Sequence, residues 1–160
     1  MSSENGGETG DLIHLLCFSL DDQTFALPVR DVEKVMRAVA VSVLPDSPDI
    51  IIGVVNVRGK ILPVADMRRR LSLPPKEYGI DDSLLWVTVA GRGLLLIVDA
   101  VLGVQALPKN EIIEASSLPQ TPPLVKGIAR LPGGLLIIQN LAELLNLEQR
   151  KVLEDALAHY

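Results

Sequence analysis

The chain contains two similar halves, and this repetition constrains its fold more than any other feature of the sequence. Residues 15–35 align with residues 84–104 at an offset of 69, and residues 53–71 align with residues 127–145 at an offset of 74. Apolar positions match apolar positions in both alignments. The two offsets differ by five residues, and these extra residues lie in one connection of the second half. Because a repeat changes the unit of folding from the whole chain to one half, we expect two half-domains of one design, about residues 12–72 and 83–147.

The composition predicts a core built from small aliphatic side chains. Hydrophobic residues make up 48% of the 160 residues, but aromatic residues make up only 3%, a balance typical of many short strands. The polar residues 1–11 are expected to form a flexible tail. They lack the order of a secretory signal, and no apolar run approaches the roughly 18 residues of a membrane span. We therefore expect a soluble cytoplasmic protein.

Two β-hairpins are predicted in the first half. The strand-like run His14–Leu20 is followed by a polar turn and by the run Thr24–Pro28. The runs Ile50–Val57 and Lys60–Ala65 flank a second turn, Arg58-Gly59. Each half should supply about five short strands, too few to bury both faces of an open sheet. Closing each half into a small barrel would remove the exposed edges.

Short helices are expected between the strands. Apolar residues at helical intervals after the second strand, namely Val32, Val35 and Met36, predict a short helix there. Asp66 and its repeat counterpart Asn140 should each cap a short helix, because their side-chain oxygens accept hydrogen bonds from the first helical turn. At the C-terminus, residues 148–160 have the apolar spacing of an amphipathic helix that packs back on the barrels.

No catalytic, cofactor-binding or metal-binding site is predicted. The two histidines, His14 and His159, have no ligand-spaced neighbours, and the single cysteine, Cys17, lies in an apolar strand pattern. The sequence gives no reason for Asp66 and Asp99 to meet. The net charge of −5 disfavours a nucleic-acid-binding small barrel, the alternative from another class. We interpret the densest basic run, residues 68–70, as the solvated face of a short helix.

Arg58 is the exception, because it lies in the turn between two apolar strands. Its repeat counterpart is Pro132, so the repeated fold does not require a charge at this position. One interpretation is that Arg58 keeps the turn soluble or pairs with an acid. The other is that Arg58 contacts a partner protein, a role in which arginine is enriched because of its planar group with several hydrogen-bond donors.

The residues around Arg58 resemble a known family. Residues 53–68, GVVNVRGKILPVADMR, are similar to the pattern G-V-x-N-x-R-G-x-I-x-P-V-x-D-L-R of CheW-type chemotaxis coupling proteins. Supporting similarities occur at residues 18–29, 44–45, 97–101 and 140–145, so the resemblance runs from about Leu12 to Leu147. It implies a mainly β fold of two intertwined five-stranded SH3-like barrels with short helices and a C-terminal helix, and no enzymatic activity.

The resemblance also implies partners and site residues. Such proteins are adaptors that bridge the cytoplasmic tip of a chemoreceptor to the regulatory domain of a CheA-type histidine kinase. They need no cofactor, and they reach the membrane only through receptors gathered in arrays at its inner face. The receptor-binding residues expected from the motif and its surroundings are Arg58, Asn56, Val57, Val32 and Lys34. The residues expected to be structural are Gly53, Gly59 and Asp66.

One position departs from the family pattern. The family usually has V-x-E-I after the second strand, whereas this chain has Val32-Glu33-Lys34-Val35. Lys34 therefore reverses a charge near the expected receptor surface. This predicts a receptor tip of altered charge or a dedicated chemosensory pathway, such as one that controls pilus-based motility.

Overall fold

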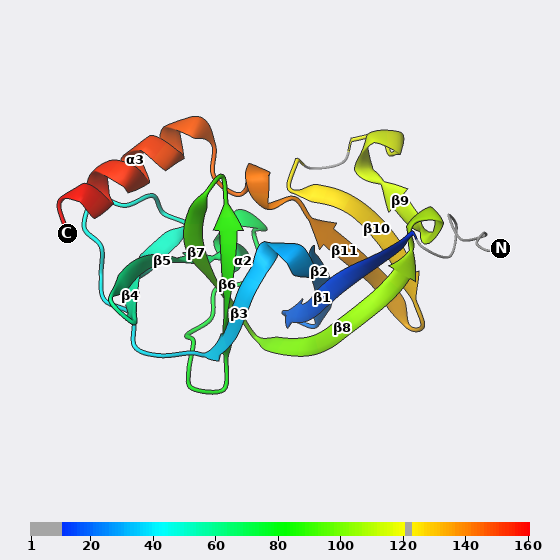
Figure 1. The fold of residues 1–160 in the computed structure, drawn as a ribbon, viewed down its shortest axis with the longest axis horizontal. Helices are drawn as coiled ribbons and strands as arrows, with labels where there is room; N and C mark the ends of the chain where they lie inside the picture. Colours follow the sequence, from blue (N-terminus) through cyan, green and yellow to red (C-terminus); the bar gives the residue numbers. More distant parts are fainter. Residues whose placement is uncertain (1–10, 121–122) are drawn as a thin grey trace.

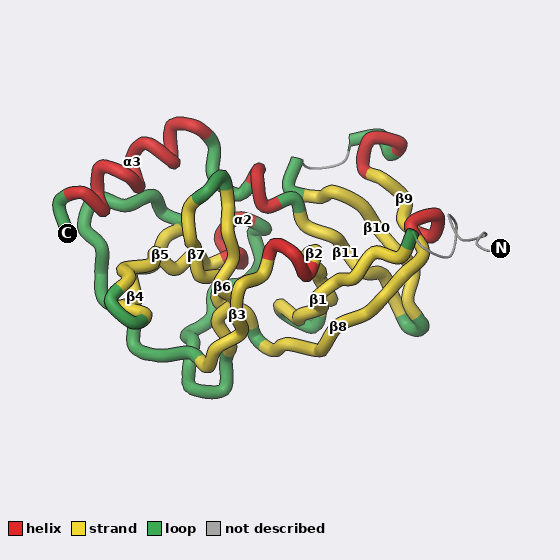
Figure 2. Tube along the Cα trace, viewed as in Figure 1, coloured by secondary structure: helices red, strands yellow, loops and turns green. Residues whose placement is uncertain are grey.

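The structure is a computed structural model that describes residues 11–120 and 123–160. The expected tail, residues 1–11, lies outside the described residues except for Asp11. Strands dominate the described part and helices are short (Figure 2), which confirms the prediction of a mainly β fold. The elements, with η for 3-10 helices, are β1 (Leu12–Leu20), β2 (Gln23–Pro28), η1 (Val29–Asp31), β3 (Val32–Arg37), β4 (Ile51–Val57), β5 (Lys60–Asp66), α2 (Met67–Arg70), β6 (Ser83–Val89), β7 (Arg92–Val98), β8 (Ala100–Pro108), η2 (Lys109–Glu111), β9 (Ile112–Glu114), η3 (Ala115–Ser117), β10 (Val125–Leu131), β11 (Gly134–Gln139), η4 (Leu141–Glu143) and α3 (Leu147–Ala158).

The strands of the described residues form two sheets that lie side by side (Figure 1). The β1 sheet has the order β8-β1-β2-β11-β10-β9, and the β6 sheet has the order β3-β6-β7-β5-β4. Each strand of the β1 sheet other than β9 has a repeat counterpart in the β6 sheet: β8 corresponds to β3, β1 to β6, β2 to β7, β11 to β5 and β10 to β4. The counterparts occur in the same order in both sheets. The two sheets are therefore copies of one design. The β1 sheet has the additional short strand β9, and a bridge between Ser42 and Val54 takes its place in the β6 sheet.

Each sheet contains strands from both halves of the sequence. The chain passes from the β1 sheet to the β6 sheet at Val29–Asp31, and it returns at Asp99. Within each sheet, one parallel pair joins the two contributions: β2 with β11, and β7 with β5. Neither sheet can form from one half alone, so the expectation that each half closes on itself is wrong: the halves exchange strands and must fold together.

The main core lies between the two sheets, and each sheet also encloses a smaller cluster. Neighbouring residues on one strand point to different clusters, because side chains alternate across a sheet. Leu85 belongs to the main core, whereas Leu84 belongs to the cluster inside the β6 sheet. Phe18 and Phe25 stack in the main core with ring centroids 6.0 Å apart. Burial on both faces explains why these strands are continuously apolar.

The helix predicted at Val32, Val35 and Met36 is wrong. These residues lie in β3, which pairs antiparallel with β6; only the three residues Val29–Asp31 before them form a 3-10 turn. Three apolar residues are too few to separate a helical period from that of a strand. Here β-branched residues and pairing with β6 decide the outcome.

The helix ends are predicted only in part. The side chain of Asp66 caps α2 by accepting a hydrogen bond from the Arg68 N–H at 3.0 Å, which confirms that prediction. Asn140 precedes the 3-10 turn η4 but makes no capping bond through its side chain, so the second predicted cap is wrong. The C-terminal helix α3 begins at a capping box formed by Asn146 and Gln149. It buries Leu153 and Ala156 in the main core.

Candidate partner-binding surface

The β4–β5 turn presents Arg58 to solvent. Arg58 and Gly59 have φ values of 50° and 88°, the left-handed pair that a two-residue hairpin turn requires. The side chain of Asn56 accepts a hydrogen bond from the Gly59 N–H at 2.8 Å. Arg58 itself is exposed and forms no hydrogen bond or ion pair with any described residue. Asn56 and Gly59 thus hold the shape of the turn and leave the guanidinium of Arg58 free.

Gly53 is needed where the chain bends at the start of β4. A Cβ atom at this position would lie 2.2 Å from the carbonyl oxygen of Ser42. That carbonyl accepts a hydrogen bond from the Val54 N–H at 2.7 Å, and the Ser42 N–H donates to the Val54 carbonyl at 2.9 Å. The close approach explains why only glycine fits at residue 53.

The other motif residues differ in their access to solvent. Lys34 is exposed on β3, directly opposite Trp86 of β6. Val57 is half-buried beside the cluster inside the β6 sheet, and Val32 is half-buried against the main core. Of these three residues, Lys34 is therefore the one that a partner can reach fully.

The edge strands β3 and β8 add apolar surface. Each pairs with only one neighbouring strand, so one side of its backbone is unpaired. Val35 on β3, and Leu102 and Val104 on β8, are exposed by 43%, 56% and 60%. Apolar side chains on an open strand edge mark a surface on which another protein can dock.

Hollows occur at equivalent places in the two sheets, but their linings differ. The hollow at the β6 sheet has a volume of about 470 Å³ and an apolar lining that includes Val41, Ile52 and Ile80. Its counterpart at the β1 sheet has a volume of about 500 Å³, and its lining includes Arg30 and Lys126. The two ends of the molecule therefore offer different chemistry.

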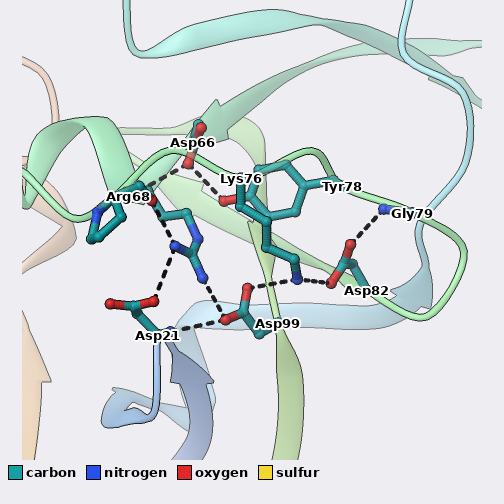
Figure 3. A network of polar contacts seen from close by, with 9 residues as sticks. Asp21, Asp66, Arg68, Lys76, Tyr78, Gly79, Asp82 and Asp99 are labelled. Atoms are coloured by element: carbon teal, nitrogen blue, oxygen red, sulfur yellow. Dashed lines mark hydrogen bonds and ion pairs between the residues drawn. The ribbon is translucent and has the colours of Figure 1, made fainter.

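A network of polar side chains lies where the chain passes between the sheets (Figure 3). Arg68 is only 3% exposed, and its guanidinium lies 2.6 Å from Asp99 and 3.5 Å from Asp21. It also donates to the Pro74 carbonyl at 2.7 Å. The Asp21 N–H donates to Asp99 at 2.8 Å. These contacts join α2, the β1–β2 turn and the crossing at Asp99.

The connection from α2 to β6 completes this network. Lys76 pairs with Asp82 at 2.7 Å and with Asp99 at 3.2 Å. The Tyr78 hydroxyl donates to Asp66 at 2.7 Å; burial and this hydrogen bond raise the pKa of Tyr78 well above its ordinary value. The groups are mutually paired rather than directed into an open cleft, so the network acts as a structural clamp.

The charges in the clamp shift the pKa values of its members. Burial lowers the pKa of Arg68, but its hydrogen bond and charge interaction with Asp99 outweigh this effect, and the pKa is raised overall. Burial raises the pKa of Asp99, but hydrogen bonds from Asp21, Arg68 and Lys76 lower it overall. The charged forms of Arg68 and Asp99 are therefore favoured in the folded protein.

The clamp corrects two interpretations of the sequence. Arg68 is buried and paired, so residues 68–70 are not simply a solvated face; only Arg69 and Arg70 are exposed. Asp66 and Asp99, which had no evident reason to meet, belong to one network. The repeat counterparts of Asp66, Arg68 and Asp99 are Asn140, Ala142 and Arg30. The comparison of halves that singled out Arg58 could therefore have found Arg68.

The described residues show neither a metal site nor a helix that could span a membrane. No group of three or more His, Cys, Asp and Glu side chains among them is placed to hold a metal ion. Among the same residues, no helix has the length and apolar character needed to cross a membrane. Cys17 is a buried free thiol whose pKa is raised by burial.

Comparison with known proteins identifies the family. Residues 14–151 match the CheW-like domain. A chemotaxis protein CheW from Rhizobium meliloti (strain 1021) is 24% identical over 92% of this chain and 93% of its own length. Protein FrzA from Myxococcus xanthus is 35% identical over 61% of each chain. The crystal structure of the scaffolding protein TtCheW from Thermoanaerobacter tengcongensis has a TM-score of 0.78 and 30% identity, covering 86% of this chain and 94% of that one.

The fold thus defines a mainly β domain of two SH3-like barrels. The chain belongs to the CheW-like domain family.

Proposed function

We propose that the protein is a non-catalytic adaptor that couples chemoreceptors to a CheA-type histidine kinase in bacterial chemotaxis signalling. The observation that carries this proposal is the CheW-like match over residues 14–151. The free Arg58 side chain, at the tip of a turn built by the most specific part of that match, supports it.

The receptor-binding surface is proposed to lie around the β4–β5 turn and β3. Arg58 supplies a charge with several donors, and Asn56 fixes the turn that presents it. Val57, Val32 and Lys34 complete the group, and Val35 on the same edge strand adds apolar area. Arginine is one of the residue types enriched in interface hot spots.

The kinase regulatory domain is proposed to dock at the apolar hollow of the β6 sheet. Val39 and Ile80, which line this hollow, are exposed by 54% and 79%. This concentration of exposed apolar residues is unusual for a surface that remains in water. The hollow at the β1 sheet, whose lining has different chemistry, supports a second contact with a partner of the same kind. Two such contacts would allow assembly end to end.

Signal transfer through such an adaptor needs no chemistry. A receptor can change kinase activity if it makes different contacts with the adaptor in its two signalling states. The interlocked sheets and the clamp at Asp99 keep both proposed binding surfaces in one rigid unit. On this proposal the protein acts in the cytoplasm and reaches the membrane only through receptor arrays. Neither a cofactor nor a nucleic acid takes part.

A dedicated pathway is the second candidate. The similarity to FrzA of Myxococcus xanthus and the reversed charge at Lys34 both favour an adaptor that serves its own receptors. An output such as pilus-based motility fits the same fold.

Co-precipitation tests the proposal. Purified protein is mixed with a chemoreceptor cytoplasmic fragment and a CheA-type regulatory domain from the same organism, separately and together. We expect each to be retained, and all three to form one complex. Failure to retain either partner at micromolar concentration would contradict the proposal.

A further inference from the structure

An aromatic platform lies on the β6 sheet. Trp86 is half-buried on β6, and its indole extends over Gly93 of β7 toward β5. A Cβ atom at Gly93 would lie 3.0 Å from Nε1 of Trp86 and 2.9 Å from Cδ2 of Leu62. The absence of a side chain at Gly93 therefore makes room for the ring.

Two lysines lie on the same face of the sheet as this ring. The Nζ atom of Lys60 lies 5.7 Å from the centroid of the Trp86 ring, a cation–π distance. Lys34 is the partner of Trp86 in the antiparallel β3–β6 pair, and directly opposite residues share one face of a sheet. Met36, two residues further along β3, packs in the same cluster as Trp86, which places Lys34 on this face. We call Trp86, Lys34 and Lys60 the Trp86 patch.

The charges of the patch are unpaired. Lys34 and Lys60 are exposed, and neither forms an ion pair with any residue in the described ranges. Glu33 lies next to Lys34 in sequence, but its carboxylate accepts a hydrogen bond from the Thr88 hydroxyl at 3.4 Å. Two unpaired ammonium groups on one face of the sheet favour the approach of an anion.

The other half of the chain shows that the fold does not require these residues. The repeat counterparts of Lys34, Trp86 and Lys60 are Gly103, Cys17 and Gly134. Cys17 and Gly103 are opposite one another in the β1–β8 pair, as Trp86 and Lys34 are in the β3–β6 pair. The same backbone geometry is therefore built without an aromatic ring or a charge.

We propose that the Trp86 patch binds an acidic side chain, a glutamate, on the cytoplasmic hairpin of the receptor. The glutamate methylenes would lie on the indole, and its carboxylate would accept hydrogen bonds from Lys34 and Lys60. Charge-assisted bonds of this kind are stronger than neutral ones. This inference rests on the proposed receptor-binding function, and it adds two residues and the chemistry of the partner group.

The single tryptophan of the chain allows a direct test. The probe is the cytoplasmic hairpin fragment of a chemoreceptor from the same organism, titrated while tryptophan emission is followed. We expect the emission to change on binding. Lys34→Gln and Lys60→Gln should each weaken binding roughly threefold to tenfold, whereas Lys34→Arg should retain most of it. Lys151→Gln, at an exposed lysine on α3, is the matched control and should bind as the unmodified protein does.

The salt dependence and the receptor side complete the experiment. Affinity should fall with added salt less steeply in the double variant Lys34→Gln/Lys60→Gln, because screening then has fewer charges to act on. One Glu→Gln change in the receptor fragment should weaken binding to the unmodified protein but not to the double variant. If Arg58→Ala weakens binding while both lysine variants bind normally and the emission stays constant, the inference is wrong and the proposed function stands. If the unmodified protein binds no receptor fragment, both are wrong.

Discussion

Arg68 and Asp99 join segments that belong to different sheets: Nη2 of Arg68, on α2, lies 2.6 Å from Oδ2 of Asp99, between β7 and β8. Asp99 is the point at which the chain returns from the β6 sheet to the β1 sheet. The ion pair therefore fixes the relative position of the two sheets at a crossing. The proposed contacts at the hollows of the two sheets depend on that position, so the clamp links stability to function.

Removal of Arg68 should destabilise the protein strongly. Arg68→Ala would remove the shorter of the two ion pairs of Asp99 and leave its partly buried carboxylate with only Lys76 and the Asp21 N–H. We expect a loss of roughly 2–4 kcal/mol in the free energy of unfolding, slightly below the range for a fully buried pair because Asp99 is 21% exposed. Urea denaturation measures it. Arg69→Ala, at an exposed neighbour, is the control and should cost about 1 kcal/mol or less. Equal losses in the two variants would show that the clamp does not stabilise the fold.

Stability should decline in acid because of Asp99. Its pKa is lower in the folded protein than in the unfolded chain, owing to Asp21, Arg68 and Lys76. Such a group stabilises the fold above its unfolded pKa, and the contribution is lost as the pH falls through the folded pKa. The free energy of unfolding should therefore fall below about pH 4, and Asp99→Asn should flatten that decline. Urea denaturation at a series of pH values measures the decline, with Asp81→Asn as an exposed control. If both variants keep the full decline, the prediction is contradicted.

Gly53 should not tolerate a side chain. In Gly53→Ala the new Cβ would collide with the backbone carbonyl of Ser42, which cannot move without breaking its bonds to Val54. We expect a loss of about 2–4 kcal/mol in unfolding free energy. Gly134→Ala, where the Cβ would meet open space, should change stability by less than about 1 kcal/mol. Thermal melts of both variants distinguish the outcomes, and similar melting temperatures would refute the steric explanation.

The sequence predicted the locally specified features of the fold well and those that depend on pairing between distant strands poorly. The repeat and the turn residues predict the hairpins β1–β2 and β4–β5, because turns are specified locally. The strand β3 was mistaken for a helix, because Val32, Val35 and Met36 fit either period and only pairing with β6 decides between them.

The geometry of the candidate surface was predicted where it depends on a local motif. The turn at Arg58 has the expected exposure because Asn56 and Gly59 build it from adjacent residues. The Arg68–Asp99 pair and the Lys60–Trp86 contact join residues 31 and 26 positions apart. Such contacts exist only after the strands have been arranged, so spacing along the chain does not reveal them.

The most direct test of the account is calorimetric titration of a chemoreceptor hairpin fragment into the protein and into Arg58→Ala. Arg130→Ala is the matched control, because Arg130 is an exposed arginine on the other sheet that forms no bond with any described side chain. We predict that Arg58→Ala weakens binding by roughly tenfold or more, the loss of an interface hot spot, with unfolding unchanged and Arg130→Ala binding normally. Equal affinity of Arg58→Ala and the unmodified protein would contradict the central claim that this turn is the receptor contact.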